Sequence, residues 1–327
     1  MYDNRRTHVI PLIDLSRWRD GSPDEKKSIA AELDEALRTS GFLMLSGHGI
    51  PPDLPEAIRR EARRFFNLPV DAKRRYETTV GGRGWVAFGS EVNSFYGDAA
   101  DTSLPDLKES YTIGCDRRTG DPRIDEDWFI ENVWPSEVPE LKPLCDSYAD
   151  AVRQVYTDTL GLCAAALGLP TDWFEQRTGR SPHTFNINRY PPLTQTGRPA
   201  EGQFRIAPHT DWGVLTILDR QVGYGGLEVQ LPEGDWVQAP HVPGAFTVNI
   251  GDLMARWTGD RWRSTRHRVL PPADDAPDEE LISLIMFCEA DVDAVITSLP
   301  APIGRVEHPS VIAGEYFLER ATAATIV

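Results

Sequence analysis

The sequence predicts a mainly β protein with additional helices, in which a β-sandwich or barrel follows a more helical N-terminal half. Two observations support this fold class. In the first half, several segments place apolar residues three and four positions apart, which is typical of helices with one buried face. From about residue 183 the pattern changes to short β-type runs broken by proline and glycine, which is typical of a sandwich or barrel.

Local signals predict the first elements. Residues 9–15 form a short apolar run that favours a strand. The segment Ser22-Pro23-Asp24-Glu25 predicts the start of a helix, because it combines a capping serine, a proline at the first helical position and a glutamate three residues after the cap. Gly41 lies just past the apolar stripe and predicts the end of this helix, and residues 42–45 favour a second strand.

Two more helices and a loop are expected before the β-rich region. Residues 53–66 predict a helix on which a run of arginines forms a solvated face. Residues 81–97 are rich in glycine and aromatic residues, and they could either close over a substrate or pack as a surface loop. The longest helical pattern covers residues 141–167, where a single apolar stripe predicts a buried scaffold helix that ends at Gly168.

The composition restricts the partners and the location of the protein. A chain of 327 residues with 40% hydrophobic and 26% charged residues is ordinary for a folded globular protein, and a net charge of −16 argues against nucleic-acid binding. The four cysteines are scattered, so free buried thiols are expected. The polar N-terminus precedes no long apolar run, so we expect no signal peptide, no membrane association and a cytoplasmic location. The oligomeric state stays undetermined.

The strongest chemical signal is His209-Thr210-Asp211, taken together with the distant His267. Residues at i and i+2 of a strand point to the same side, so His209 and Asp211 can reach one metal ion. Short strands and turns separate them from His267, which suits a third ligand from a neighbouring strand. Two imidazoles and one carboxylate that leave three positions open are typical of non-haem Fe(II) oxygenases. These three residues are therefore the predicted metal ligands and catalytic residues.

Two other classes of function compete with this interpretation. The same three side chains could bind zinc for hydrolysis, but zinc favours four-coordinate sites, and no other motif indicates a hydrolase. A non-catalytic binding module would not need a complete set of metal ligands. All three ligands are present, so we expect an iron-dependent oxidoreductase.

Further motifs accompany the metal residues in a fixed order. They lie at residues 10–15, 41–50, 186–192, 225–229, 236–237, 248–252, 283 and 293–296. This ordered set resembles the isopenicillin N synthase-like family of Fe(II)- and 2-oxoglutarate-dependent oxygenases. The resemblance implies a double-stranded β-helix, or jelly roll, as an Fe(II)-binding core with N-terminal and flanking helices. We expect this core at residues 180–296, an N-terminal helix and strand region at 8–130 and a C-terminal segment at 297–327, all within one compact unit.

The resemblance also implies two co-substrates, 2-oxoglutarate and O2. Members of the family bind 2-oxoglutarate on the iron and use it with O2 to remove hydrogen from a substrate, releasing succinate and carbon dioxide. They usually hold the far carboxylate of 2-oxoglutarate with an Arg-x-Ser pair on a late strand and with a tyrosine ahead of a proline. Here Tyr190 and Ser283 match this pattern, but Leu281 stands where the arginine is expected.

Leu281 leaves three alternatives open. Arg189, beside Tyr190, or Arg205, at an even offset from His209, could supply the missing cation. The enzyme could instead be an oxidase that uses O2 without 2-oxoglutarate, as isopenicillin N synthase does. The pocket could also have changed to accept another keto acid. We expect the 2-oxoglutarate-dependent enzyme.

The resemblance implies a small-molecule substrate from secondary metabolism. Hydroxylation, desaturation and cyclisation are not distinguished, because they differ only in the fate of one substrate radical. Several aromatic residues could line an apolar pocket for the substrate, and they are Trp85, Phe95, Tyr96, Phe204 and Phe287.

Overall fold

The computed structural model describes residues 9–93, 103–221, 223, 226–273 and 275–324. Its main helices are α1 (Ser16–Asp20), α2 (Pro23–Thr39), α3 (Asp53–Phe66), α4 (Val70–Lys73), α5 (Pro122–Trp128), α6 (Leu141–Ala166), α7 (Leu193–Thr196), α8 (Asp252–Trp257) and α9 (Ala313–Ala324). Short 3-10 helices occupy Arg74–Tyr76 and Glu175–Arg177. The capping box at Ser22 and Glu25 begins α2 as predicted, since the Ser22 side chain accepts from the Glu25 N–H and Glu25 accepts from the Ser22 N–H.

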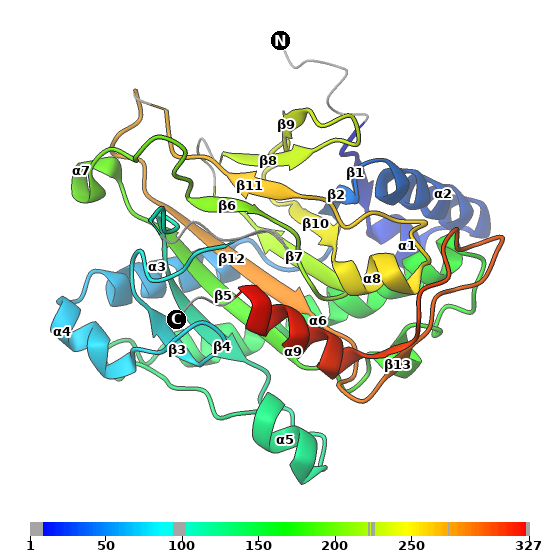
Figure 1. The fold of residues 1–327 in the computed structure, drawn as a ribbon, viewed down its shortest axis with the longest axis horizontal. Coiled ribbons are helices and arrows are strands. Elements are labelled where there is room, and N and C mark those ends of the chain that lie inside the picture. The colour runs from blue at the N-terminus through cyan, green and yellow to red at the C-terminus, as the bar shows by residue number, and fades with distance from the viewer. Residues whose placement is uncertain (1–8, 94–102, 222, 224–225, 274, 325–327) are drawn as a thin grey trace.

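Two facing β-sheets form the centre of the molecule (Figure 1). The large sheet has the order β1 (Leu12–Asp14), β2 (Phe42–Ser46), β10 (Phe246–Ile250), β7 (Leu215–Asp219), β12 (Leu281–Cys288), β5 (His183–Tyr190), β4 (Glu109–Gly114) and β3 (Gly84–Val86). The small sheet has the order β6 (Ile206–His209), β11 (His267–Val269), β8 (Leu227–Gln230) and β9 (Trp236–Gln238), and β13 (Val295–Ile296) pairs separately with β14 (Val311–Ile312). This arrangement confirms the predicted mainly β fold with a jelly-roll core.

Strands from the N-terminal half extend the large sheet at both edges. β2 pairs with β10 on one side, and β4 pairs with β5 on the other. All of these pairs are antiparallel, whereas β1 and β2 run parallel. The predicted strands at 9–15 and 42–45 are therefore present, and the N-terminal region contributes directly to the sheet that carries the core.

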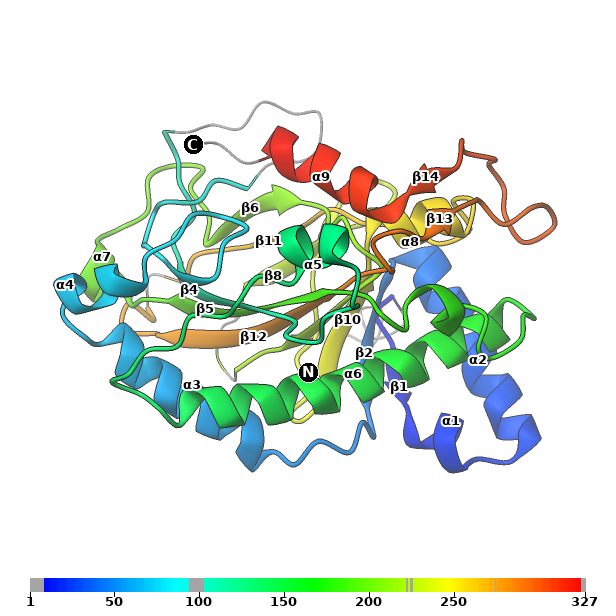
Figure 2. The same cartoon turned by 90° about the horizontal axis from the view of Figure 1, so that it is seen from below.

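Helices cover the outer face of the large sheet. Figure 2 shows α3, α6 and α2 along one side of this sheet and the small sheet on the other side. The apolar stripe of α6 is buried, and α6 contacts both β12 and β7. The prediction of a scaffold helix over residues 141–167 is thus confirmed. Amphipathic helices bury one face in this way because only a sheet or another helix can cover it.

The alternation of side chains in the central strands separates two hydrophobic regions. In β12, Ile282, Leu284 and Met286 face the helices and belong to the larger cluster. Leu281 belongs to the smaller cluster between the two sheets. Because successive side chains of a strand point to opposite faces, Ser283 shares the inner face with Leu281. The space between the sheets therefore receives polar as well as apolar side chains.

The sequence analysis predicted that the arginines of α3 form a solvated face, but one of them is buried. The side chain of Arg59 is only 3% exposed, and it pairs with Asp219 and Glu56. Arg60 and Arg64 are 67% and 57% exposed. The prediction was wrong for Arg59 because its position on the helix faces the ends of the central strands β7 and β12, where it also donates to the backbone oxygen of residue 282.

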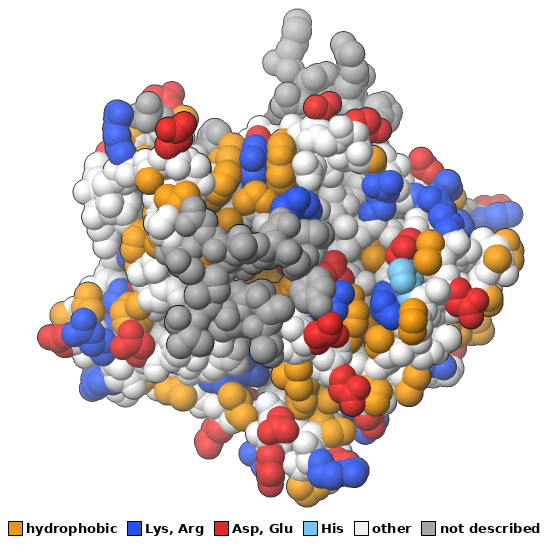
Figure 3. All heavy atoms as spheres, viewed as in Figure 1, with side chains coloured by type: hydrophobic (Ala, Val, Ile, Leu, Met, Phe, Trp, Pro, Cys, Tyr) orange, Lys and Arg blue, Asp and Glu red, His pale blue; other side chains and the backbone are white. Residues whose placement is uncertain are grey.

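The surface and the cysteines agree with the sequence analysis. All four cysteines are free and buried. On the face drawn in Figure 3, the basic side chains that are shown lie interspersed with acidic ones. Among the helices of the described ranges, none is long and apolar enough to span a membrane.

Candidate active site

Strand pairing brings the three predicted metal ligands together. β6 ends at His209, and β11 begins at His267, which lies directly opposite His209 in the antiparallel register. Asp211 follows β6 by two residues, and its Oδ1 atom lies 3.7 Å from Nε2 of His209 and 3.8 Å from Nε2 of His267. The ligand atoms all lie within 4.8 Å of one another. One metal ion can therefore contact all three.

Backbone carbonyl groups orient both imidazoles. Nδ1 of His209 donates to the Ala207 oxygen at 2.8 Å, and Nδ1 of His267 donates to the Thr265 oxygen at 3.1 Å. A carbonyl can only accept, so each Nδ1 carries a hydrogen, and Nε2 is the nitrogen of each ring that can bind a metal. Burial, and next the neighbouring His209, lower the pKa of His267 to about 4. His267 is therefore neutral at pH 7, as a metal ligand must be.

Two cross-strand neighbours orient the carboxylate. Thr216 of β7 and Asn249 of β10 are paired in the sheet register, and their side chains donate to Oδ2 of Asp211 at 2.5 and 2.7 Å. Oδ1 is left for a metal. Burial acts to raise the pKa of Asp211, but His267, His209 and these two hydrogen bonds together lower it. Asp211 is thus ionised and aimed at the point where both imidazoles meet.

Sequence reasoning did not identify either supporting residue. Asn249 lies in one of the motifs at residues 248–252, which was a usable signal, whereas nothing in the sequence marks Thr216 as a partner of Asp211. The donor set of two neutral imidazoles and one carboxylate on one side fits Fe(II) with open coordination positions. The second polar atom of each ligand, which is Nδ1 in the two histidines and Oδ2 in Asp211, is also held by a hydrogen bond, and this fits a metal site as well.

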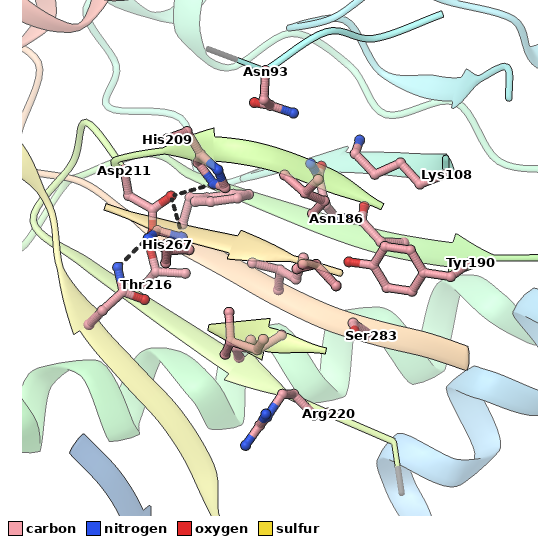
Figure 4. Close-up of a pocket in the computed structure, with 18 of the residues that line it drawn as sticks. Asn93, Lys108, Asn186, Tyr190, His209, Asp211, Thr216, Arg220, His267 and Ser283 are labelled. Atoms are coloured by element: carbon pink, nitrogen blue, oxygen red, sulfur yellow. Dashed lines mark hydrogen bonds and ion pairs between the residues drawn. The ribbon is translucent and has the colours of Figure 1, made fainter. Parts of the chain in front are cut away.

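A cavity of about 90 Å³ extends from the triad into the space between the two sheets (Figure 4). Tyr190 and Ser283, both predicted to bind the co-substrate, line this cavity at the end away from the triad. Asn186 and Asn188 line it as well, because they share one face of β5 with Tyr190. The Oδ1 atoms of both asparagines are buried without a hydrogen-bond partner among the described residues.

Arg189 and Arg205, the two predicted cations, lie outside this cavity. Arg189 occupies the opposite face of β5, where its guanidinium pairs with Glu109 at 2.8 Å and Glu280 at 2.9 Å. Arg205 pairs with Glu279 at 3.0 Å and stacks on the outer side of the Tyr190 ring. Strand alternation and these acidic partners direct both side chains elsewhere, so the structure corrects the expectation that either supplies the missing cation.

Arg220 is a cation that does line the cavity. Arg220 is the first residue after β7. Its side chain continues the strand face that carries Thr216 and Leu218, which also line the cavity. In the described part of the chain no acidic side chain pairs with it, and its guanidinium donates to the backbone oxygens of Ala239 and Pro240. Burial lowers the pKa of Arg220 to about 10, so it remains charged at pH 7.

Lys108 is the other basic side chain among the described residues of this cavity wall, and it is already paired. Its ammonium group binds Glu91, and Asp106 lies nearby. Burial acts to lower the pKa of Lys108, but the two acids raise it above its ordinary value. A new anion would have to compete with Glu91 for Lys108, whereas Arg220 has no such competitor.

A second and larger cavity of about 220 Å³ opens on the other side of the triad. His209 and Asp211 line both cavities, so the triad lies where the two meet. Ser110, Thr112, Thr184 and other polar residues of β4 and β5 form one wall of the larger cavity. Of the aromatic residues expected around a substrate, Phe287 lines both cavities, Trp85 and Phe204 line neither, and Phe95 and Tyr96 lie outside the described residues.

Comparison with known proteins places this site in a family. Residues 10–137 match the model of the N-terminal region of a non-haem dioxygenase in morphine synthesis, and residues 182–290 match the 2OG-Fe(II) oxygenase superfamily. Validamycin A dioxygenase of Streptomyces hygroscopicus subsp. limoneus is 40% identical over 319 residues, which is 96% of this chain and 86% of the relative. The chain belongs to the 2OG-Fe(II) oxygenase family.

Other members of the family share the whole fold. The 2-oxoglutarate-dependent dioxygenase citB of Monascus ruber is 30% identical over 97% of this chain and 96% of its own. The structure of Neurospora crassa T7H with α-ketoglutarate and thymine superposes with a TM-score of 0.82 at 27% identity, and 96% of each chain is covered. JOX2 with 2OG, Fe and JA gives a TM-score of 0.73 at 26% identity over 95% of this chain and 84% of its own.

Family membership confirms the predicted activity. The protein is an Fe(II)- and 2-oxoglutarate-dependent dioxygenase that uses O2 and acts on a small molecule. The mainly β fold, the iron cofactor and the 2-oxoglutarate co-substrate all agree with the sequence analysis. The comparisons favour this enzyme over the oxidase that works without 2-oxoglutarate, the zinc hydrolase and the binding module.

Proposed function

We propose that Nε2 of His209, Nε2 of His267 and Oδ1 of Asp211 hold the catalytic Fe(II), and that the enzyme oxidises a C–H bond of a small polar metabolite. The proposal rests on the convergence of these three atoms. In each ligand the second polar atom of the side chain forms a hydrogen bond that fixes its orientation. The bound metal and 2-oxoglutarate supply the chemistry that activates O2. The protein residues fix where the substrate lies and keep water away from it.

The cavity between the sheets is the proposed site for 2-oxoglutarate. Its far carboxylate would lie between Tyr190, Ser283 and Arg220 at the end away from the triad. Tyr190 and Ser283 offer hydroxyl donors, and Arg220 offers the positive charge that Leu281 cannot. A buried carboxylate needs such a partner, because an unpaired ion in the interior is costly.

The larger cavity is the proposed substrate site. Its polar wall from β4 and β5 supports a substrate with several hydrogen-bonding groups. A relative at 40% identity is named a validamycin A dioxygenase, and another at 30% identity is the 2-oxoglutarate-dependent dioxygenase citB of a fungus. These relatives support a small molecule of secondary metabolism as the substrate.

The organisation of the chain is also part of the proposal. We infer that residues 1–327 fold as one compact unit, with an Fe(II)-binding core at 180–296, an N-terminal region at 8–130 and a C-terminal segment at 297–327. Pairing of β2 with β10 and of β4 with β5 supports this unity. The four free buried cysteines support a cytoplasmic location, where thiols stay reduced.

An anaerobic titration of the Fe(II)-loaded protein with 2-oxoglutarate tests the proposed site. A keto acid chelated to Fe(II) produces a visible charge-transfer band, which we expect to appear and saturate. The His209→Ala variant serves as the matched control and should show no band. If iron binds to the wild type and no band forms at any concentration of 2-oxoglutarate, the proposed co-substrate site is wrong.

A further inference from the structure

A buried carboxyl group at the end of β12 has no partner among the residues that the structure describes. Glu289 directly follows the last residue of this strand, and only 9% of its surface is exposed. Its carboxyl group packs against Gly213, where an added Cβ atom would lie 2.5 Å from both carboxyl oxygens. No hydrogen bond or ion pair reaches this carboxyl group from the residues that the structure describes. A buried polar group in this state calls for an explanation.

Glu289 lies in the proposed substrate cavity and not in the proposed co-substrate cavity. Every second residue of β12 faces inward, and Ser283, Ile285 and Phe287 line the cavity between the sheets. Phe287 and Glu289 line the larger cavity on the other side of the triad. The same strand face therefore carries the proposed 2-oxoglutarate contact at one end and Glu289 at the other, about 20 Å apart at 3.3 Å per residue.

The charges around the larger cavity leave Glu289 uncompensated. The other acids that line it are Asp211, which faces the metal position, and Glu91, which pairs with Lys108. No lysine or arginine of the described ranges lines this cavity. Burial, and next the nearby Asp211, raise the pKa of Glu289 to about 8. Ionised Glu289 is thus unfavourable in the free protein, and a cation brought by a ligand would relieve this cost.

The remaining polar groups of the cavity are uncharged. Ser110, Thr112 and Thr184 supply hydroxyl groups, and the Oδ1 atom of Asn186 is buried without a partner in the described structure. These groups suit the hydroxyl groups of a substrate, since the protein hydroxyls can donate or accept a hydrogen bond and the Oδ1 atom of Asn186 can accept one. Only Glu289 offers a full charge that is not already bound to another protein group or directed at the metal.

We infer that Glu289 is a specificity-determining residue that binds a protonated nitrogen of the substrate, so that the enzyme acts on small hydroxylated amines. The inference rests on the proposed function, because it takes the larger cavity as the substrate site. A charged hydrogen bond from an ammonium group to the Glu289 carboxylate fixes one end of the substrate. The hydroxyl and amide groups on β4 and β5 then orient the rest of the molecule toward the triad.

Two polyols that differ in one group test this inference. D-glucamine and D-sorbitol are identical except that C1 carries an amino group in the first and a hydroxyl group in the second. Each is titrated anaerobically into the protein loaded with Fe(II) and 2-oxoglutarate, and binding is measured by calorimetry at pH 7. We expect the wild type to bind D-glucamine at least about tenfold more tightly than D-sorbitol, because only the amine is charged.

The variant Glu289→Gln keeps the size of the side chain and removes its charge. We expect it to bind D-glucamine no more tightly than D-sorbitol while its affinity for D-sorbitol stays unchanged. Glu228→Gln is the matched control, since Glu228 lies on β8, pairs with Arg268 and lines neither cavity. It changes the net charge by the same amount and should keep the preference for the amine.

The outcomes separate this inference from the proposed function. Equal binding of the two polyols by the wild type, or no detectable binding of D-glucamine, would overturn the role of Glu289. A preference for D-glucamine that survives in Glu289→Gln would overturn it as well. Binding of 2-oxoglutarate is measured first on every protein, and its loss in the wild type would contradict the proposed co-substrate site instead. Far-ultraviolet circular dichroism confirms that each variant is folded.

Discussion

Arg220 directly follows β7, the strand that pairs with β12, and the same register extended by one residue brings it beside Ser283. The register pairs Leu218 with Ile285 and Asp219 with Leu284, and one further step places Arg220 opposite Ser283. Both side chains line the cavity between the sheets. In the proposed co-substrate site, Arg220 therefore takes the place of the arginine that Leu281 lacks. A positive charge can reach the same carboxylate from either strand, because cross-strand neighbours lie only about 5 Å apart.

Replacing Arg220 tests this compensation. We expect Arg220→Gln to weaken 2-oxoglutarate binding at least about 30-fold, corresponding to roughly 2 kcal/mol for a charged hydrogen bond. Adding Leu281→Arg to that variant should restore much of the affinity, since Leu281 lines the same cavity. Arg205→Gln should change it by less than about threefold, because Arg205 lies outside the cavity. Anaerobic calorimetry measures all four proteins, and unchanged binding by Arg220→Gln would refute the assignment.

Removal of a metal ligand should abolish iron binding. His209→Ala and Asp211→Ala each delete one of the three converging donors, so we expect no stoichiometric Fe(II) and no O2 consumption driven by substrate. The fold should persist, because the ligands lie at the ends of strands and not in the hydrophobic clusters. Iron content and circular dichroism measure the two effects. Full turnover by either variant would show that the metal lies elsewhere.

The hydrogen bonds that orient Asp211 should affect metal affinity, although the residues that donate them do not bind the metal. Thr216→Val removes a hydrogen bond to Oδ2 of Asp211 while keeping the shape of the side chain. We expect Fe(II) affinity to fall about 10- to 100-fold, as is usual when a group that orients a ligand is lost. Thr247→Val is the control, because Thr247 lies on β10 and donates to Met44 instead. Equal metal affinities for the two variants would argue against an orienting role.

A buried ionic cluster on β4 should dominate the stability of the sheet edge. Glu109 accepts from Lys73 at 2.7 Å, from Trp85 at 2.8 Å and from Arg189 at 2.8 Å. Glu109→Gln leaves buried Lys73 without its anion and Arg189 with Glu280 alone, so we expect a loss of about 3 kcal/mol in the free energy of unfolding. Urea denaturation of the metal-free protein measures it. A loss below about 1 kcal/mol would mean that water or other groups replace the carboxylate.

The stability of the protein should depend on pH through His183. Burial, and next the guanidinium of Arg153, lower the pKa of His183 to about 4 from an ordinary value of 6.5. Below pH 6.5 this histidine becomes protonated in the unfolded chain, whereas in the folded protein it stays neutral down to about pH 4. The free energy of unfolding therefore decreases as the pH falls toward 4. The free energy of unfolding of His183→Gln should fall by up to about 3 kcal/mol less than that of the wild type over this interval. Parallel denaturation curves at each pH measure the difference, and identical slopes for both proteins would contradict the prediction.

The order and spacing of the residues were enough to predict the fold class, the three metal ligands and the chemistry. The spacing of apolar residues predicted the helix over residues 141–167 and the change to short strands. Burial of one face makes apolar residues recur at a regular interval, and this interval can be recognised in the sequence. His209 and Asp211 were visible as a pair because they are two residues apart. The ordered motifs then implied 2-oxoglutarate, and Leu281 exposed the missing arginine.

The other side chains that surround the triad could be identified only in the folded arrangement of the strands. Arg220 and Asn249 lie far in sequence from the residues they approach, and strand register brings them within reach, whereas Thr216 reaches Asp211 from only five residues away. From the sequence, Arg189 and Arg205 were plausible partners for the far carboxylate of 2-oxoglutarate. In the structure both side chains lie outside the cavity and pair with acidic residues. Register and pairing arise from contacts between distant segments, and no local pattern encodes them. For the same reason, the lone carboxyl group of Glu289 became visible only when its surroundings were known.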